Sequence, residues 1–288
     1  DEVNQLLGID SDREVALSMV SIGRTSHETV ESSRDLTPLS VLTSPLSEHE
    51  VDYPEMRVMH AATSLLSGSE AALWREQTLV PASLASEGHV WKLDPHPEMA
   101  VNPIEEVVRF RGSSRRFEHS PISFQEFSTL LYCSAQGIAA DFLEPSGVSL
   151  NQWYLIVHAV EGLPAGAYVL HLQSWELELL KEGNFRREAG HLGLDQELPA
   201  DASATVFFLA DLESILERFG NRGYRAVQLE AGILGGKLYL AAYAQRLGAT
   251  GLTFYDDDVI EFFSPHADGK CAIFLMAVGH SRKRKLLQ

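Results

Sequence analysis

From Pro103 onward the sequence predicts a compact α+β domain built around a long, buried helix. Segment 224–247 is apolar on almost every side and is followed by Gly248, so it is typical of a central helix. Apolar runs of strand length, several of them joined by turns, occupy 153–160, 166–172, 175–180, 204–211, 249–254 and 271–278. Together these patterns indicate several strands packed with helices in one domain.

Two shorter helices are expected before the first of these strands. Segment 103–110 begins with a proline, which a helix tolerates in its first turn. The next helix has Ser123 as its N-cap, Glu126 three residues later and Gly137 beyond its end. In the long helix, three glycines each cost about 1 kcal/mol relative to alanine. We therefore expect another helix, with a ligand as the alternative, to approach the backbone closely at Gly232, Gly235 and Gly236.

The N-terminal segment 1–23 resembles segment 262–279 of the same chain. Each has an apolar pair, a polar turn-rich stretch and an apolar run that ends in glycine. We therefore expect 15–22 to form a strand, and 1–23 to be the tail of an upstream copy in a tandem-duplicated protein. Residues 24–102 are expected to form a linker with one helix after Pro54, followed by coil, and 103–288 to form the folded domain.

The acidic composition disfavours nucleic acid as a partner, because 40 Asp and Glu residues face 23 Lys and Arg residues. No apolar run approaches the length of a membrane span, and the first residues lack the pattern of a signal peptide. Cys133 and Cys271 lie far apart in apolar surroundings, as buried thiols of a reduced protein do. We expect a cytoplasmic protein without a nucleic acid or membrane partner.

Common nucleotide and metal motifs are missing from the sequence. Segment 231–238 departs from the P-loop pattern at its first glycine and at its final Ser/Thr. The eleven histidines show no ligand spacing. Three adjacent carboxylates at 256–258 cannot all face one ion, and acidic residues are in any case favoured at the start of a helix. We expect no metal site.

A basic cluster, "FRGSSRRF" at 110–117, stands out in this acidic chain. Arginine presents a planar fork of donors that matches phosphate oxygens, and serine adds a short donor beside it. Two interpretations stay open from these residues alone: a phosphate site, or a solvated cluster that balances nearby carboxylates.

Four stretches in order along the chain carry a family resemblance. They are "RGSSRRF" (111–117), "PSGVSLNQWYLIV" (145–157), "NRGYRAVQLEAG" (221–232) and "LGATGLTFYDDD" (247–258). Together they resemble the FMN-dependent nitroreductase superfamily, and they are closest to its SagB-type dehydrogenases, which oxidise azoline rings in peptides. The resemblance covers about residues 104–280.

This resemblance implies a mixed, mainly antiparallel sheet flanked by helices, an FMN cofactor and flavin-mediated hydride transfer. The first motif would grip the FMN phosphate and ribityl chain, and the loop 145–147 would contact the isoalloxazine ring. The residues implied for cofactor binding are Arg111, Ser113, Arg115, Pro145, Ser146, Gly147, Ser149, Gly251, Leu252 and Arg282. Tyr224 is the candidate for proton transfer.

The resemblance also implies a shared site between two domains, in a homodimer or a pseudo-dimer with the upstream copy. The substrate would be an azoline-containing peptide, a nitro compound or a quinone. Two departures from the family pattern leave a second hypothesis open. The loop after Gly248 is short and lacks a glycine just before the aromatic residue, and Gly236-Lys237 replaces the common Gln-Asn. The alternative is a flavin-free scaffold for binding or dimerisation.

Overall fold

The computed structural model describes residues 2–20, 22–23, 37–40, 47–77, 86, 88–99, 102–143 and 148–282. The chain divides into two compact units, residues 1–71 and 72–288. In the first unit, α1 spans Glu2–Leu7 and α2 spans Pro54–Ala62, while α3 (Gly68–Arg75) crosses the boundary. The second unit contains all of the strands described below.

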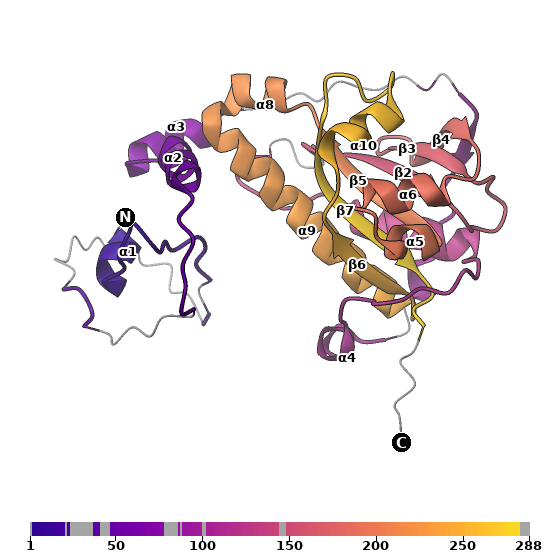
Figure 1. The fold of residues 1–288 in the computed structure, drawn as a ribbon, viewed down its shortest axis with the longest axis horizontal. Coiled ribbons are helices and arrows are strands. Elements are labelled where there is room, and N and C mark those ends of the chain that lie inside the picture. Colours follow the sequence, from indigo (N-terminus) through magenta and orange to yellow (C-terminus); the bar gives the residue numbers. More distant parts are fainter. Residues whose placement is uncertain are drawn as a thin grey trace. The chain divides into compact units, whose positions relative to one another are not determined.

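A seven-stranded sheet forms the centre of the second unit, with the order β1-β4-β3-β2-β5-β7-β6 (Figure 1). Every neighbouring pair of strands is antiparallel. The strands are β1 (Val90–Lys92), β2 (Gln152–Val157), β3 (Gly166–His171), β4 (Glu176–Glu182), β5 (Ala204–Ala210), β6 (Gly248–Leu252) and β7 (Cys271–Gly279).

Helices cover both faces of this sheet, because the buried strands are apolar on both sides. In β2, Trp153 and Leu155 pack into the same hydrophobic cluster as α5 and α9, whereas Tyr154 and Ile156 pack with α6 and α10. The helices are α4 (Ile104–Phe110), α5 (Phe124–Ser134), α6 (Arg186–Leu192), α7 (Glu197–Asp201), α8 (Leu212–Phe219), α9 (Gly223–Ala244) and α10 (Asp256–Phe263), with 3₁₀ turns at Pro97–Met99 and Gly220–Arg222. The α+β class predicted from the sequence is confirmed.

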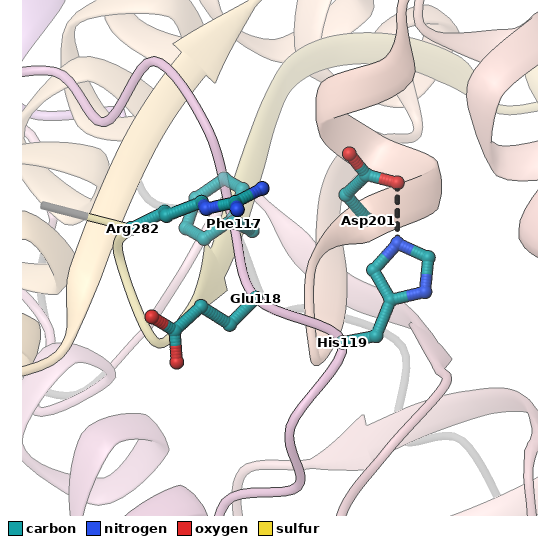
Figure 2. A pocket seen from close by; sticks show the side chains of 5 residues that line it. All are labelled: Phe117, Glu118, His119, Asp201 and Arg282. Atoms are coloured by element: carbon teal, nitrogen blue, oxygen red, sulfur yellow. Dashed lines mark hydrogen bonds and ion pairs between the residues drawn. The ribbon is translucent and has the colours of Figure 1, made fainter. Parts of the chain in front are cut away.

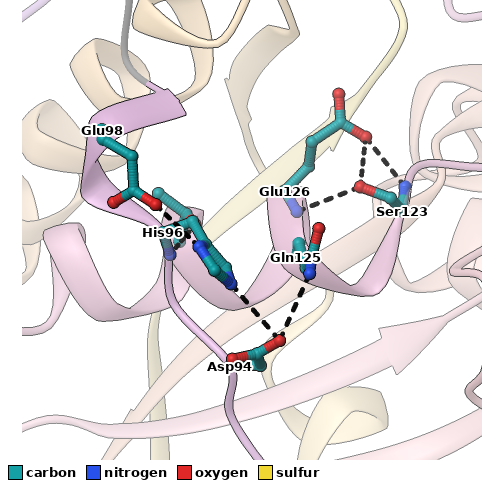
Figure 3. Close-up of polar contacts among 7 residues, drawn as sticks. Asp94, His96, Glu98, Ser123, Gln125 and Glu126 are labelled. Carbon is teal, nitrogen blue, oxygen red and sulfur yellow. Dashed lines mark hydrogen bonds and ion pairs between the residues drawn. The ribbon is translucent and has the colours of Figure 1, made fainter.

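The expected capping box begins α5 (Figure 3). Ser123 Oγ accepts a hydrogen bond from the Glu126 amide at 3.1 Å, and the Glu126 carboxylate accepts from the Ser123 amide at 2.8 Å. The preceding segment is attached to the same helix, because the His96 amide donates to Thr129 Oγ1 at 2.7 Å. A side-chain hydrogen bond to Glu98 raises the pKa of the half-buried His96. These contacts fix the start of the domain core.

The long helix α9 lies along β6 and β7 (Figure 1) and buries one side against them. A Cβ atom on Gly235 would lie 2.5 Å from the Phe274 ring of β7, so a strand side chain, not another helix, requires this glycine. Cβ atoms on Gly232 and Gly236 would meet open space. The expectation of a helix close to all three glycines is therefore wrong for Gly235.

The N-terminal third differs from the expectations in three places. Residues 14–20 form no strand among the described residues, and Met19 and Val20 are exposed. The region expected to be coil up to about 103 contains α3 and β1, and β1 pairs with β4. The sequence of β1 is short and weakly patterned, and it forms a strand because it pairs with the edge of β4.

Two further expectations concern the cysteines and the membrane. Both cysteines are free, as expected, but neither is fully buried: Cys133 is half-buried, and Cys271 is exposed at the first position of β7. Among the described residues, every helix is too short or too polar to cross a lipid bilayer.

Candidate functional site

The basic cluster lies in the loop between α4 and α5, where it pairs with the ends of two strands. The Ser114 amide donates to the carbonyl of Ala249 in β6 at 2.9 Å. The Glu118 amide donates to the His280 carbonyl at 2.9 Å, just beyond β7. The first motif and the β6–β7 region, which are far apart in the sequence, are thereby brought together.

Tyr239 of α9 joins three of the residues predicted to bind the cofactor. Its hydroxyl accepts a hydrogen bond from the Gly251 amide at 2.8 Å and lies 3.0 Å from Ser113 Oγ. The guanidinium carbon of Arg111 lies over the Tyr239 ring, 5.1 Å from its centroid. The sequence analysis missed Tyr239, although a phenol in a mostly apolar helix indicates a hydroxyl that needs a partner.

The cluster offers donors and positive charge suited to a phosphate. Arg111 and Arg115 are exposed, and neither takes part in an ion pair between residues that the structure describes. The hydroxyl of Ser114 is buried and has no hydrogen-bond partner among those residues. A Cβ atom on Gly248 would clash with Ser114 and Ser281, so glycine is required for this close approach. The donor set therefore fits the phosphate end of FMN.

The backbone of Arg282 is hydrogen-bonded to the basic loop, whereas its side chain lines an open hollow. Its amide donates to the Arg116 carbonyl at 3.0 Å. An open hollow of about 400 Å³ is lined by Phe117, Glu118, His119, Asp201 and Arg282. Figure 2 shows Arg282 beside Phe117, with His119 and Asp201 across the hollow and joined by a 2.6 Å contact. Among the described residues, no hydrogen bond or ion pair joins the Arg282 side chain to Tyr239 or Arg111, so its phosphate role stays a prediction.

The residues predicted to contact the flavin ring are only partly described. Pro145, Ser146 and Gly147 lie outside the described residues. Ser149 Oγ donates to the Asn151 carbonyl at 2.9 Å, immediately before β2. Leu252, at the end of β6, is partly buried against Phe117 and its neighbours. These positions therefore lie at the ends of β2 and β6.

The candidate for proton transfer, Tyr224, is half-buried in the first turn of α9. Its hydroxyl accepts a hydrogen bond from Gln228 Nε2 at 3.3 Å. The guanidinium carbon of the nearby Arg222 lies 5.6 Å from the ring of Trp74, which comes from α3. Tyr224 lies at the N-terminal end of α9, whereas Tyr239 lies near the C-terminal end of the same helix. Tyr224 is therefore not among the residues gathered around Tyr239.

The model of the Nitroreductase family matches residues 108–280, more than half of the chain. The chain belongs to the Nitroreductase family. This match spans both the basic cluster and α9, and it confirms the family predicted from the four stretches. Family membership also confirms the predicted class of enzyme, an oxidoreductase.

Individual relatives agree with the family match. A Methanocaldococcus jannaschii protein named as a nitroreductase, MJ1384, is 25% identical over 171 residues, which are 57% of this chain and 86% of that protein. A solved nitroreductase structure from Anabaena variabilis is 26% identical with a TM-score of 0.66 and covers 86% of this chain. This chain spans only 52% of that structure's length.

A third comparison concerns the fold alone. The structure of the E. coli microcin synthetase McbBCD complex with truncated pro-MccB17 matches with a TM-score of 0.52 and 14% identity. The match covers 91% of this chain and 85% of the matched chain. At this identity the comparison supports the nitroreductase-like fold that the sequence motifs predict.

Proposed function

We propose that this chain is an FMN-dependent oxidoreductase, or the FMN-binding part of one. The observation that carries the proposal is the junction at Tyr239, where Ser113 and Gly251 meet beside the exposed Arg111, with the exposed Arg115 two residues beyond Ser113. FMN would supply the hydride chemistry when bound. The protein's own contribution would be to hold the phosphate, place the ring and exclude water.

In this proposal Arg111 and Arg115 donate to the phosphate oxygens and Ser113 adds a hydroxyl donor. Guanidinium forks match phosphate geometry and need no deprotonation step at neutral pH. Tyr239 would keep Arg111 and Ser113 in place from below. Gly251 and Leu252 would bring the β6 backbone near the cofactor, and Tyr224 would hold a proton on its phenol oxygen.

A second subunit or domain is part of the same proposal, because α9 presents an uncovered apolar stripe. Leu229 is 54% exposed and Ile233 is 38% exposed, and the neighbouring Gly232 and Gly236 face open space. On α4, which contacts α9, Val108 is 58% exposed. Contiguous apolar surface of this kind is typical of an interaction site. We expect a homodimer or a pseudo-dimer with an upstream copy to cover it.

The substrate class is the finer part of the proposal. The Pro-Ser-Gly and Arg-Gly-Tyr-Arg stretches support a SagB-type dehydrogenase that oxidises azoline rings in a peptide. The fold match to a chain of a microcin synthetase complex, solved with a peptide bound, is consistent with this. Reduction of nitro compounds or quinones is the other outcome that a substrate assay would distinguish.

Titration with FMN tests the proposal. The full chain should bind FMN, and the double variant Arg111→Ala, Arg115→Ala should bind it at least tens-fold more weakly, because charge-assisted hydrogen bonds contribute about 1.5 to 3 kcal/mol each. The matched control is Arg187→Ala, an exposed arginine on α6. Equal affinity in wild type, double variant and control would refute the phosphate assignment. No binding by the wild type would favour the flavin-free scaffold.

A further inference from the structure

A histidine at the end of α6 contacts two carboxylates through its two ring nitrogens. His191 Nδ1 lies 2.9 Å from Asp195 Oδ1, in the turn after α6, and His191 Nε2 lies 2.9 Å from Asp258 Oδ2, in the first turn of α10. An ionised carboxylate only accepts hydrogen bonds, so both ring nitrogens must donate. This geometry therefore calls for the doubly protonated, positively charged imidazole.

Tyr255, the residue before α10, completes the same cluster. Its hydroxyl donates to Asp195 Oδ2 at 3.0 Å, its amide donates to the Leu192 carbonyl at 3.0 Å, and its ring centroid lies 5.2 Å from that of His191. Hydrogen bonds from His191 and Tyr255 hold the pKa of Asp195 below its ordinary value, so this carboxyl group is ionised at neutral pH. We call His191, Asp195, Tyr255 and Asp258 the α6–α10 clasp.

The turn inside the clasp has a strained backbone. Leu194 and Asp195 have φ values of 58° and 56°, in the left-handed region that residues other than glycine rarely adopt. Residues in such conformations persist where the surrounding contacts hold them, and they are frequent in switch regions. Leu194 is 37% exposed, so apolar packing does little to hold this turn. The side-chain contacts of Asp195 and the 3.2 Å hydrogen bond from its amide to the His191 carbonyl hold it instead.

Loss of one ring proton from His191 would turn an attraction into a repulsion. A neutral imidazole has one N–H donor and one acceptor, so one ring nitrogen would direct a lone pair at a carboxylate oxygen. Among the described residues, Asp195 and Asp258 are the charged groups that act on His191, and their hydrogen bonds to its side chain raise its pKa. No second cation in this cluster of described residues would replace the lost charge.

We propose that the α6–α10 clasp is a pH-operated switch, in which the charged ring of His191 holds the first turn of α10 on α6 and proton loss releases that turn together with the strained residues 194–195. The raised pKa sets the direction: the clasp is closed below the ordinary histidine value of about 6.5 and opens as the pH rises through the raised value. Tyr255 follows Leu252, the last residue of β6, by three residues, so opening reaches the end of that strand. The clasp contains none of the residues proposed to bind FMN.

Proton NMR and amide hydrogen exchange of the full chain test the switch between about pH 6 and about pH 9. The His191 ring signal should titrate at a lower pH in Asp195→Asn and in Asp258→Asn, which each remove one carboxylate. The protection of the Tyr255 amide, corrected for the intrinsic exchange rate, should fall several-fold in step with the wild-type titration, as expected for exposed ion pairs. The Ala189 amide, which donates to the Phe185 carbonyl within α6, should show no such step.

Two variants of His191 separate the charge from the packing of its side chain. His191→Gln, which has no charge, should give low Tyr255 protection without a pH step, whereas His191→Arg, which stays charged, should keep protection high over the whole range. His119→Gln is the matched control, because His119 contacts a different aspartate, Asp201, at 2.6 Å. Tyr255 protection that shows no step in wild type, or a step that persists in His191→Gln, overturns the proposal, and so does loss of the step in His119→Gln.

Discussion

Tyr239→Phe isolates the hydroxyl at the centre of the candidate site. The variant keeps an aromatic ring under Arg111 but removes the acceptor of the Gly251 amide at 2.8 Å and the partner of Ser113 at 3.0 Å. A typical intramolecular hydrogen bond contributes about 1 kcal/mol net, so two give about 2 kcal/mol. With a urea m-value of about 2 kcal/mol per M, the unfolding midpoint should fall by about 1 M.

Urea unfolding and FMN titration of the same preparations measure this prediction. The affinity for FMN should also fall several-fold, because Ser113 and Gly251 lose their common partner. Tyr243→Phe, on the same helix, is the matched control, since its hydroxyl makes no hydrogen bond among the described residues. If the two variants have equal midpoints, the Tyr239 hydroxyl is not a structural link and the reasoning about the site is wrong.

Three further predictions concern the rest of the second unit. Gly235→Ala should lower the unfolding temperature, since the added Cβ would lie 2.5 Å from Phe274. Gly236→Ala places its Cβ in open space and should raise the stability of the monomer by up to about 1 kcal/mol. Equal shifts of the unfolding temperature in the two variants would contradict the packing of α9. Burial lowers the pKa of His158 to about 3, so its contribution to stability is complete above its ordinary value and is lost as pH falls toward 3. Between pH 6.5 and 4 the unfolding free energy of His158→Gln should therefore fall less steeply than that of wild type, by about 1.4 kcal/mol per pH unit, and parallel curves would refute this. Trp74→Ala should cost about 3 kcal/mol, because the indole donates to the Phe219 carbonyl at 2.8 Å and packs against the core, and an unchanged urea midpoint would exclude it from that core.

The sequence by itself determined the features that depend on neighbours along the chain. The Ser123–Glu126 capping box and the apolar strands followed from local patterns that need no knowledge of the rest of the fold. The spacing of Arg111, Ser113 and Arg115 is compatible with a phosphate site, because a phosphate needs several donors within a short reach, but it left a solvated cluster open, and the family resemblance favoured the phosphate.

Only the tertiary structure decided which distant residues meet. Tyr239 lies 126 residues from Ser113, and Glu230 lies 80 residues from Leu150, so no local pattern predicts either contact. The placement of the Arg282 side chain in a hollow with Asp201 likewise follows from the pairing of the chain after β7 with the basic loop. The physical reason is that antiparallel pairing and helix packing create these contacts between segments whose separation along the chain leaves no periodic signal.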